Sequence, residues 1–338
     1  MPNQVSRSDT GETFEIADGE SILEAALRVG VRLPHECTFG GCGTCRIKVQ
    51  QGAVHYDEFP MALTEDEHEQ GFALACQAKP LSDLVIEPAT AGLEFADPVN
   101  VTAQVVAVDA LTRGIARLRL QLPSLPEVAY RPGQYMNILL PDEGARSFSM
   151  ACATMWDNMV DFHIRRISNG YFTEGILNSL RPGDSLDIEV PHGTFCYHAD
   201  DWRPMILAAT GTGIAPIKAI LESLLDNDDC PPVSLYWGMQ TECDLYLRDE
   251  IESWRDRLCE FEFVPVLSRA DDGWTGRRGY VQDEIVKDYP DLSEHAFYLC
   301  GSPEMIQQAR TAFLANGADP AFIYADSFTF QHAVLSAA

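Results

Sequence analysis

Residues 36–45 read ECTFGGCGTC, so three cysteines and three glycines fall within one short stretch. The next cysteine is far along the chain, and the full spacing is Cys37-x4-Cys42-x2-Cys45-x30-Cys76. This is the spacing of plant-type [2Fe–2S] ligands. Two bridged irons need four thiolates, which one tight loop and one distant cysteine can supply. The glycines at 40, 41 and 43 would let the loop backbone approach the bridging sulfides.

A structural zinc site and buried free thiols both fit these cysteines less well. Structural zinc sites usually show two C-x2-C pairs or Cys/His pairs, whereas this chain has a single short pair. Buried thiols would not account for the glycines between the cysteines. The pattern therefore predicts an iron–sulfur cluster whose ligands are Cys37, Cys42, Cys45 and Cys76.

The composition limits the classes of protein to consider. The chain has 338 residues, enough for two or three domains, and 46% of them are hydrophobic. No run of about 18 apolar residues predicts a membrane span, and the N-terminal residues do not resemble a secretory signal. We therefore expect a cytoplasmic protein, in which the ten cysteines are not a disulfide framework.

The net charge of −27 argues against a nucleic-acid partner, because binding to phosphates needs clustered Lys and Arg. Residues 1–95 alone contain 16 acidic and 6 basic side chains. This charge is explained equally well by solubility and by an acidic surface that docks a basic partner.

The sequence around the cysteines predicts a small α+β unit. Ser21 can cap a helix with Glu24 three residues later, and an apolar face follows at Ile22, Ala25, Ala26 and Val29. RIKVQ and DLVIEP are typical of short strands. The stretches SILEAALRVGVRLPHECTFGGCGTCRIKVQQG and LACQAKPLSDLVIE resemble the ferredoxin module of bacterial oxygenase reductases. The resemblance implies a β-grasp domain over 1–95. The Ala-, Gly- and Pro-rich composition of residues 90–98 indicates a linker, which would allow this acidic module two positions.

Residues 99–200 alternate apolar and polar positions between Pro- and Gly-rich turns, as in an antiparallel barrel. Residues 146–149, RSFS, resemble the R-x-Y-S flavin motif of the ferredoxin–NADP reductase superfamily. That motif implies a six-stranded barrel in which Arg146 binds the flavin pyrophosphate with its guanidinium fork. It also places Ser149 near the flavin N5 atom, with Ser147 and Phe148 in the same site. Phe148 replaces the usual Tyr, so the ring remains but its hydroxyl is lost.

Further flavin contacts are expected from the resemblance. Gly170 and Thr173 fit a G-x-x-[ST] pattern in which a helix N-terminus receives the pyrophosphate. The alternative is an ordinary helix cap made by Thr173 or Ser168. The remaining expected contacts are His163, Ile164 and Tyr171.

Residues 201–338 predict a doubly wound α/β domain. MILAA is a buried strand, and a helix with Ile217, Ile220, Leu221 and Leu224 on one face follows it. Between them lies the loop Gly211-Thr212-Gly213, which can approach a pyrophosphate, although Pro216 stands where the dinucleotide fingerprint has its third Gly. This loop resembles the NAD(P) loop of the same superfamily.

Three more residues receive roles from the resemblance. Cys300 and Gly301 match a C-G-x-P stretch beside the nicotinamide, and Phe328 matches an aromatic residue that covers the flavin ring. We therefore expect Ser149, Cys300 and Phe328 to be the catalytic residues. The alternatives are a structural cysteine and a core phenylalanine. No cation follows Gly238 until Arg248, so NADH is favoured over NADPH.

The motifs together predict an oxidoreductase that takes electrons from NADH and passes them singly through FAD and a [2Fe–2S] cluster to a terminal oxygenase. FAD is expected rather than FMN, because FMN relatives usually carry their ferredoxin at the other end. The resemblance favours a Rieske aromatic-ring dioxygenase as partner. It leaves open a soluble di-iron monooxygenase acting on phenol, toluene or alkenes, and a dehydratase that forms deoxysugars. A pure electron carrier or redox sensor would not need the nucleotide domain. We expect a monomer with no nucleic-acid or membrane partner.

Overall fold

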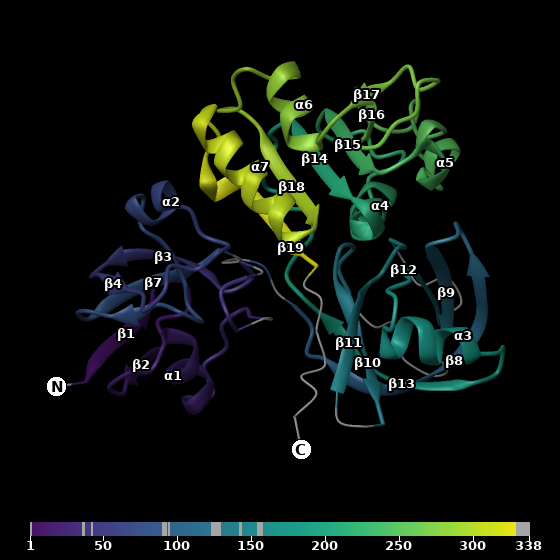
Figure 1. The fold of residues 1–338 in the computed structure, drawn as a ribbon. Coiled ribbons are helices and arrows are strands. Elements are labelled where there is room, and N and C mark those ends of the chain that lie inside the picture. Colours follow the sequence, from purple (N-terminus) through teal and green to yellow (C-terminus); the bar gives the residue numbers. More distant parts are fainter. Residues whose placement is uncertain are drawn as a thin grey trace.

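The computed structural model describes residues 2–35, 38–41, 43–89, 93, 95–122, 130–141, 144–153 and 158–328. Its strands form three large sheets, which we call the N-terminal domain, the barrel and the C-terminal domain (Figure 1). The C-terminal domain contacts both of the others, and this arrangement places the sites discussed below. No helix in the described part of the chain is both long and apolar enough to cross a bilayer.

The N-terminal domain is a mixed sheet with the order β2-β1-β7-β3-β5. Its strands are β1 (Asn3–Arg7), β2 (Thr13–Ile16), β3 (Arg46–Gln51), β5 (Phe72–Leu74) and β7 (Leu84–Pro88). β1 runs parallel to β7, and the other pairs are antiparallel. The small pair β4 (Val54–His55) and β6 (Lys79–Pro80) and the helices α1 (Ile22–Val29) and α2 (Glu65–Glu69) complete it.

Helix α1 begins with the predicted capping box. The Ser21 hydroxyl accepts a bond from the Glu24 amide at 3.2 Å, and the Glu24 carboxylate accepts one from the Ser21 amide at 2.8 Å. Ile22, Ala25 and Ala26 are buried as expected, but Val29 is 47% exposed, so its predicted place on the apolar face is wrong. Leu27, in the same last turn, is also 49% exposed, and the helix ends at Gly30 in a left-handed conformation.

The barrel has the order β11-β10-β13-β8-β9-β12, and every neighbouring pair is antiparallel. Its strands are β8 (Val99–Ala110), β9 (Ile115–Gln121), β10 (Tyr135–Leu140), β11 (Gly144–Ser149), β12 (Met159–Arg165) and β13 (Ser185–His192). A bridge between Met150 and Phe162 joins the two edges. The short helices η2 (Tyr171–Ile176) and α3 (Leu177–Ser179) add Phe172 and Leu177 to the barrel core.

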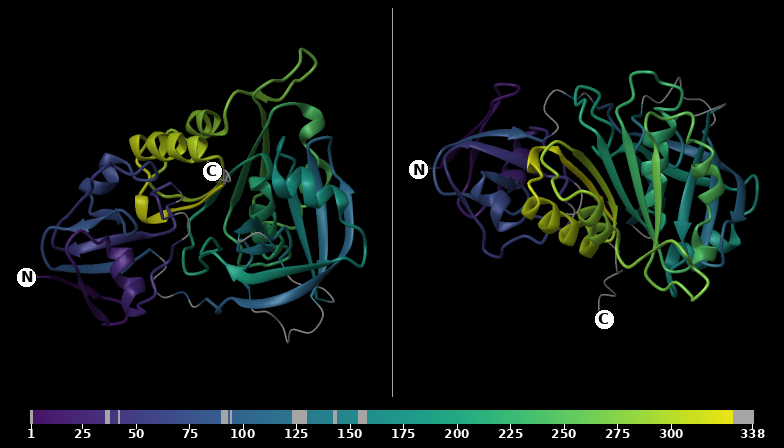
Figure 2. Two further views of the ribbon diagram at one scale, coloured as in Figure 1. Left: turned by 60° about the horizontal axis from the view of Figure 1, so that its bottom comes forward. Right: turned by 90° about the horizontal axis from the view of Figure 1, so that it is seen from above.

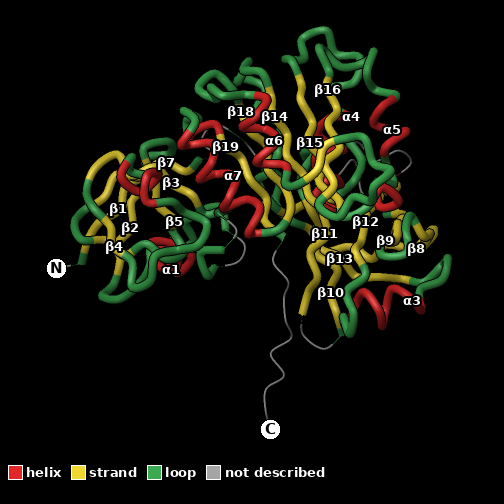
Figure 3. The backbone as a smooth tube through the Cα atoms, turned by 45° about the horizontal axis from the view of Figure 1, so that its top comes forward, coloured by secondary structure: helices red, strands yellow, loops and turns green. Residues whose placement is uncertain are grey.

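The C-terminal domain is a parallel sheet with the order β17-β16-β15-β14-β18-β19, as predicted for a doubly wound fold (Figure 3). Its strands are β14 (Met205–Thr210), β15 (Val233–Met239), β16 (Glu262–Leu267), β17 (Arg277–Arg278), β18 (Ala296–Gly301) and β19 (Ile323–Ser327). Its helices are η3 (Gly211–Gly213), α4 (Ile214–Glu222), η4 (Glu242–Asp244), α5 (Arg248–Glu252), α6 (Val281–Asp288), α7 (Pro303–Ala315) and η5 (Pro320–Phe322).

Both faces of this sheet are covered, which explains the continuous apolar runs of its strands. Leu207 and Leu235 face one core cluster, which includes residues of α4 and α5. Their neighbours Ile206 and Tyr236 face a second cluster with residues of α6 and α7. The strand order reverses between β14 and β18, and open α/β sheets bind their ligands at such a switch point.

Candidate active site

Two of the four predicted cluster ligands lie within the described structure and are neighbours. Cys45 directly precedes β3 and Cys76 closely follows β5, which is the antiparallel partner of β3. The Ala75 amide donates to the Cys45 carbonyl at 2.9 Å, so this pairing brings the two cysteines together across thirty intervening residues. Both are buried, with 2% and 6% exposure. Cys37 and Cys42 lie outside the described residues.

The backbone of the loop fits a bound cluster. Gly40 and Gly43 have φ values of +78° and +82°, which residues with a side chain rarely adopt. A Cβ atom on Gly40 would lie 2.7 Å from Pro60 Cβ, so the loop is also packed too closely for a side chain there. Thiolates on a tight glycine loop beside a buried cysteine are the donor set that a [2Fe–2S] cluster requires.

The predicted flavin motif is the second part of β11, and its side chains have different surroundings. The Phe148 ring lies 5.1 Å from that of Phe172, against the barrel core. The Ser147 hydroxyl donates to the Asn137 side chain at 2.7 Å. Ser149 is buried and faces the C-terminal domain, where its Oγ lies 3.5 Å from Asp326 Oδ2. Arg146 is half-buried and donates to the Ala145 carbonyl at 2.8 Å.

His163 and Ile164 lie on β12 with different surroundings. The His163 Nδ1 atom is 3.2 Å from the Tyr246 hydroxyl, so this side chain lies where the barrel meets the C-terminal domain. Burial, aided by the charges of Lys218 and Arg117, lowers the pKa of His163 to about 3 and keeps the ring neutral. Ile164 belongs to the barrel core, so only its backbone is available to a flavin.

A helix begins at the segment from Gly170 to Thr173 as predicted: it is the π-helix η2, with Gly170 as its N-cap. The alternative of an ordinary side-chain cap is wrong, because Gly170 is the N-cap and no side chain bonds there. The Thr173 hydroxyl instead bonds the Ile167 amide at 3.1 Å and its carbonyl at 3.2 Å. A Cβ on Gly170 would lie 2.3 Å from that hydroxyl, while Tyr171 is 48% exposed.

The predicted nucleotide loop lies at the switch point of the sheet. Gly211, Thr212 and Gly213 form η3 between β14 and α4. A Cβ on Gly213 would lie 2.3 Å from the Cys300 carbonyl oxygen, so only glycine allows this loop to approach the end of β18. Gly211 has a φ of +58°, and the space at its Cβ position is open. The loop therefore packs directly against the backbone of Cys300 and Gly301.

An unanticipated residue connects Ser149 and Cys300. Asp326 is the register neighbour of Cys300 on β19, and its Oδ2 atom lies 4.0 Å from the Cys300 sulfur as well as 3.5 Å from Ser149 Oγ. Burial raises the pKa of Asp326 to about 7, and the bond from Ser149 opposes this rise. The only signal in the sequence was its position two residues before Phe328.

The backbone of Phe328 is tied to the same strand end. Its amide donates to the Gly301 carbonyl at 2.8 Å, and its ring is partly buried against the core of the C-terminal domain. The structure therefore brings Ser149, Cys300, Gly301 and Phe328 to one place, together with Asp326.

The loop after Gly238 has a neighbour in the fold that is distant from it in the sequence. The Arg269 amide donates to the Gln240 carbonyl at 2.9 Å, and its guanidinium lies 3.4 Å from the Gln240 side-chain oxygen. A cation therefore does stand beside the end of β15. Arg248, the first cation after Gly238 in the sequence, instead pairs with Glu242 at 2.8 Å. Arg269 was missed because β16 separates it from Gln240 in sequence.

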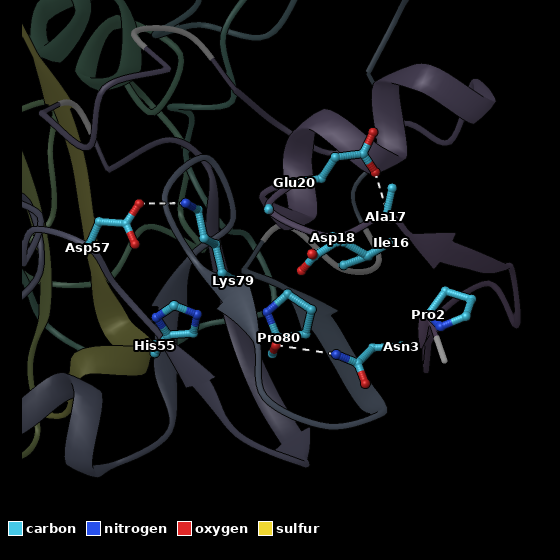
Figure 4. Close-up of a pocket in the computed structure, with 11 residues that line it drawn as sticks. Pro2, Asn3, Ile16, Ala17, Asp18, Glu20, His55, Asp57, Lys79 and Pro80 are labelled. Carbon is cyan, nitrogen blue, oxygen red and sulfur yellow. Dashed lines mark hydrogen bonds and ion pairs between the residues drawn. The ribbon is translucent and has the colours of Figure 1, made fainter.

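A further hollow lies away from this site. It has a volume of about 750 Å³ and lies on the N-terminal domain, between the β1–β2 side and the β4–β6 pair (Figure 4). Its lining includes Asp18, His55 and an ion pair between Lys79 and Asp57. None of the residues predicted for cofactors lines it.

Comparisons with known proteins agree with the three sheets. Residues 5–81 match the 2Fe-2S iron-sulfur cluster binding domain, residues 102–197 the oxidoreductase FAD-binding domain, and residues 207–311 the oxidoreductase NAD-binding domain. The xylene/toluene monooxygenase electron transfer component XylA of Pseudomonas putida is 33% identical over 96% of this chain and 93% of its own. The chain belongs to the iron–sulfur flavoprotein reductases of oxygenase systems.

Other relatives of the chain are named for different enzymes, and not all of these are oxygenases. The CDP-6-deoxy-L-threo-D-glycero-4-hexulose-3-dehydrase reductase of Yersinia pestis is 33% identical over 97% of this chain and 99% of its own. Reductase component 2 of terephthalate 1,2-dioxygenase from Comamonas sp is 32% identical over 97% and 98%. The crystal structure of the Amycolatopsis cytochrome P450 reductase GcoB superposes with a TM-score of 0.71 at 33% identity, over 96% and 98%.

These matches confirm the predicted family, the three-part fold and the reductase activity. They also confirm the [2Fe–2S], FAD and NAD cofactors. Since equally similar relatives serve a monooxygenase, a dioxygenase and a sugar dehydrase, they do not choose among the predicted acceptors.

Proposed function

We propose that this reductase oxidises NADH where β11, β18 and β19 meet, and that its electrons leave through the four predicted cysteines to a terminal oxygenase. The observation that carries the proposal is the convergence of Ser149, Cys300 and Asp326, which come from two domains. When bound, FAD accepts the two electrons of NADH and releases them singly, and the cluster carries one at a time.

The side chains around this point have separable roles in the proposal. Arg146 and the start of η2 bind the flavin pyrophosphate, and the Ser149 hydroxyl faces the reactive edge of the ring. Gly211 to Gly213 bind the pyrophosphate of the nucleotide, and Cys300 lies against the nicotinamide. Phe328 would cover the flavin ring. Asp326 holds a proton near neutral pH at 3.5 Å from Ser149.

The proposed acceptor is a Rieske aromatic-ring dioxygenase in the same compartment, the cytoplasm. A reductase of terephthalate 1,2-dioxygenase that matches along almost its whole length supports this choice. A di-iron monooxygenase is the next candidate, supported by the similarity to XylA. A deoxysugar dehydratase is the third, supported by the Yersinia reductase. The acidic residues of the first 95 positions suit a basic docking surface on any of these partners.

The first experiment is an anaerobic titration of the purified protein with NADH, followed by absorbance and electron paramagnetic resonance. We expect the flavin absorbance to bleach and a [2Fe–2S] signal to grow afterwards. Loss of flavin colour without a cluster signal, in protein that contains iron and sulfide, would contradict the proposed exit route. Product formation by each candidate oxygenase or dehydratase, supplied with NADH and this reductase, then identifies the acceptor.

The same preparation tests the choice of nucleotide. We expect NADH to give a kcat/KM at least about tenfold above that of NADPH, because no cation lies within the loop that follows Gly238. The variant Arg269→Gln tests whether Arg269, rather than Arg248, contributes to the choice of nucleotide. If NADPH is used well by the natural protein and poorly by this variant, Arg269 binds the 2′-phosphate and the NADH preference is wrong.

A further inference from the structure

Three charged side chains are buried together where the N-terminal domain meets the C-terminal domain. Glu67 on α2 lies 2.7 Å from Arg46 on β3 and 2.5 Å from Arg310 on α7. The side chains of Arg46, Glu67 and Arg310 are 5%, 0% and 4% exposed. Both views in Figure 2 show α7, coloured yellow, beside the N-terminal domain. Charges this deeply buried are rare in proteins unless they are paired.

The Glu67 carboxylate is satisfied largely within its own domain. Its second oxygen accepts bonds from the Thr64 amide at 2.8 Å and the Thr64 hydroxyl at 3.1 Å. Arg46 also donates to the Ala62 carbonyl at 3.0 Å. If the two domains moved apart, Glu67 would keep Arg46 and Thr64 as partners.

Arg310 depends on the contact more strongly. Within its own domain it donates to the Ile323 carbonyl at 3.2 Å, and Glu67 is its only ion-pair partner among the described residues. Burial and the nearby Arg46 lower the pKa of Arg310 to about 10, which still leaves it charged at neutral pH. On separation, water would solvate this guanidinium, so the contact can open without leaving a buried charge unpaired.

This contact lies next to the predicted cluster. Arg46 directly follows the ligand Cys45 in the sequence. A cavity of about 50 Å³ lies where all three parts of the molecule meet, and it is lined by Gly43 and Thr44 of the cluster loop. Its other walls include Phe195 and His198, which follow the barrel, and Arg310 with Tyr324 from the C-terminal domain. The contact therefore lies beside the cluster loop.

We propose that Arg310 and Glu67 form an interdomain latch that holds the N-terminal domain in the position where its cluster receives electrons. Arg310 is a positioning residue, because it acts through the domain that it holds and not on a reacting atom. Arg46 keeps Glu67 paired when the latch opens, which makes the docked position reversible. The electron-transfer part of this proposal rests on the proposed function, whereas the docking part does not.

The variant Arg310→Met tests the docking part, because it removes the interdomain pair and leaves Arg46 and Glu67 balanced. We expect chymotrypsin to cut the segment around Phe95 at least about fivefold faster than in the natural protein, and small-angle scattering to show a larger radius of gyration. Arg310→Lys should restore part of the protection. The matched control is Arg255→Met, an exposed Arg of the same domain that pairs with Glu252. Unchanged cleavage and scattering in Arg310→Met would overturn the latch.

The electron-transfer part is tested by rapid mixing of the same variants with NADH. In Arg310→Met we expect flavin bleaching to stay within twofold of the natural rate, and the later reduction of the cluster to slow by at least about tenfold. Cluster reduction at the natural rate, in a variant whose domains have separated, would overturn the positioning role. Failure of flavin bleaching in the natural protein would contradict the proposed function and leave the docking result standing.

Discussion

Two carboxylates are buried at the two boundaries of the C-terminal domain, and their surroundings differ. Glu67 lies where this domain meets the N-terminal domain and contacts two arginines. Asp326 lies where it meets the barrel, and its side chain faces the Ser149 hydroxyl and the Cys300 thiol. The first carboxylate therefore has charged partners, and the second has uncharged ones.

The difference shows that the partners, and not burial alone, decide whether a buried carboxyl group is charged. Burial by itself raises the pKa of Glu67, but attraction by Arg310 and Arg46 outweighs it and the pKa is lowered. Burial also raises the pKa of Asp326, and with only a hydroxyl bond in opposition it reaches about 7. Glu67 is therefore a permanent anion at neutral pH, whereas Asp326 can exchange a proton.

The two carboxylates should contribute to the pH dependence of stability with opposite signs. The lowered pKa of Glu67 contributes stability above its ordinary value of 4.5, and this is lost as the pH falls through the folded pKa. The raised pKa of Asp326 contributes stability below its ordinary value of 3.8, and this is lost as the pH rises through about 7. A fall from pH 8 to about 6.5 should therefore stabilise the barrel boundary through Asp326, whereas below 6.5 the neutral, buried His163 at the same boundary opposes this gain.

The largest expected effect is that of Glu67→Gln. It leaves two buried arginines without a counter-charge, and removing one partner from such a group costs about 3–5 kcal/mol. Urea unfolding, followed by the visible absorbance of the cluster, measures the loss. The control is Glu69→Gln, an exposed residue on the same helix, which should stay within about 0.5 kcal/mol of the natural protein. Equal stability of Glu67→Gln and the control would remove the contrast between the boundaries.

The second prediction concerns Asp326→Asn. Between about pH 4 and pH 8 the natural protein should lose up to roughly 4 kcal/mol of unfolding free energy relative to Asp326→Asn, because Asp326 must ionise while buried. The Asn variant lacks this loss and should be the more stable protein at pH 8. Fluorescence of the buried Trp237, Trp254 and Trp274 reports unfolding of this domain. The exposed Asp283→Asn is the control, and a profile for Asp326→Asn parallel to the natural one would count against the raised pKa.

A smaller shift is expected for Ser149→Ala. The Ser149 hydroxyl lowers the pKa of Asp326, so its removal should move the loss of stability to higher pH. The bond is long at 3.5 Å, and we expect it to contribute only about 1 kcal/mol. Infrared titration of the protonated carboxyl measures the shift directly. Ser147→Ala should leave the titration unchanged, since that hydroxyl bonds Asn137. A downward shift in Ser149→Ala would reverse the assigned role.

The smallest effect is expected at an exposed ion pair beside the linker. Arg32 and Asp97 are paired, with side chains 80% and 64% exposed, so solvent and salt screen their attraction. Asp97→Asn should leave chymotrypsin cleavage near Phe95 within twofold of the natural rate, and about 0.5 M NaCl should do the same. Rapid cleavage in either case would mean that surface charges, and not Glu67 with Arg310, hold the N-terminal domain.

Much of the candidate site could be predicted because its motifs are local. Gly211 to Gly213 follow a strand directly, and Ser147 to Ser149 share one strand, so short-range patterns predict where they lie. Asp326, Arg269 and Arg310 could not be assigned in this way. Each gains its meaning from a neighbour on another strand or domain, and nothing in the surrounding sequence distinguishes it from other charged residues.

The sequence by itself determined the cofactors and the order of the three parts, because cluster ligands and phosphate loops need particular residues at short, fixed spacings. The tertiary structure decided which carboxyl group stays charged and which one holds a proton near neutral pH. It also decided that Glu67 and Arg310, 243 positions apart, share a buried ion pair. Burial and partner charges control both outcomes, and these exist only after the chain has folded.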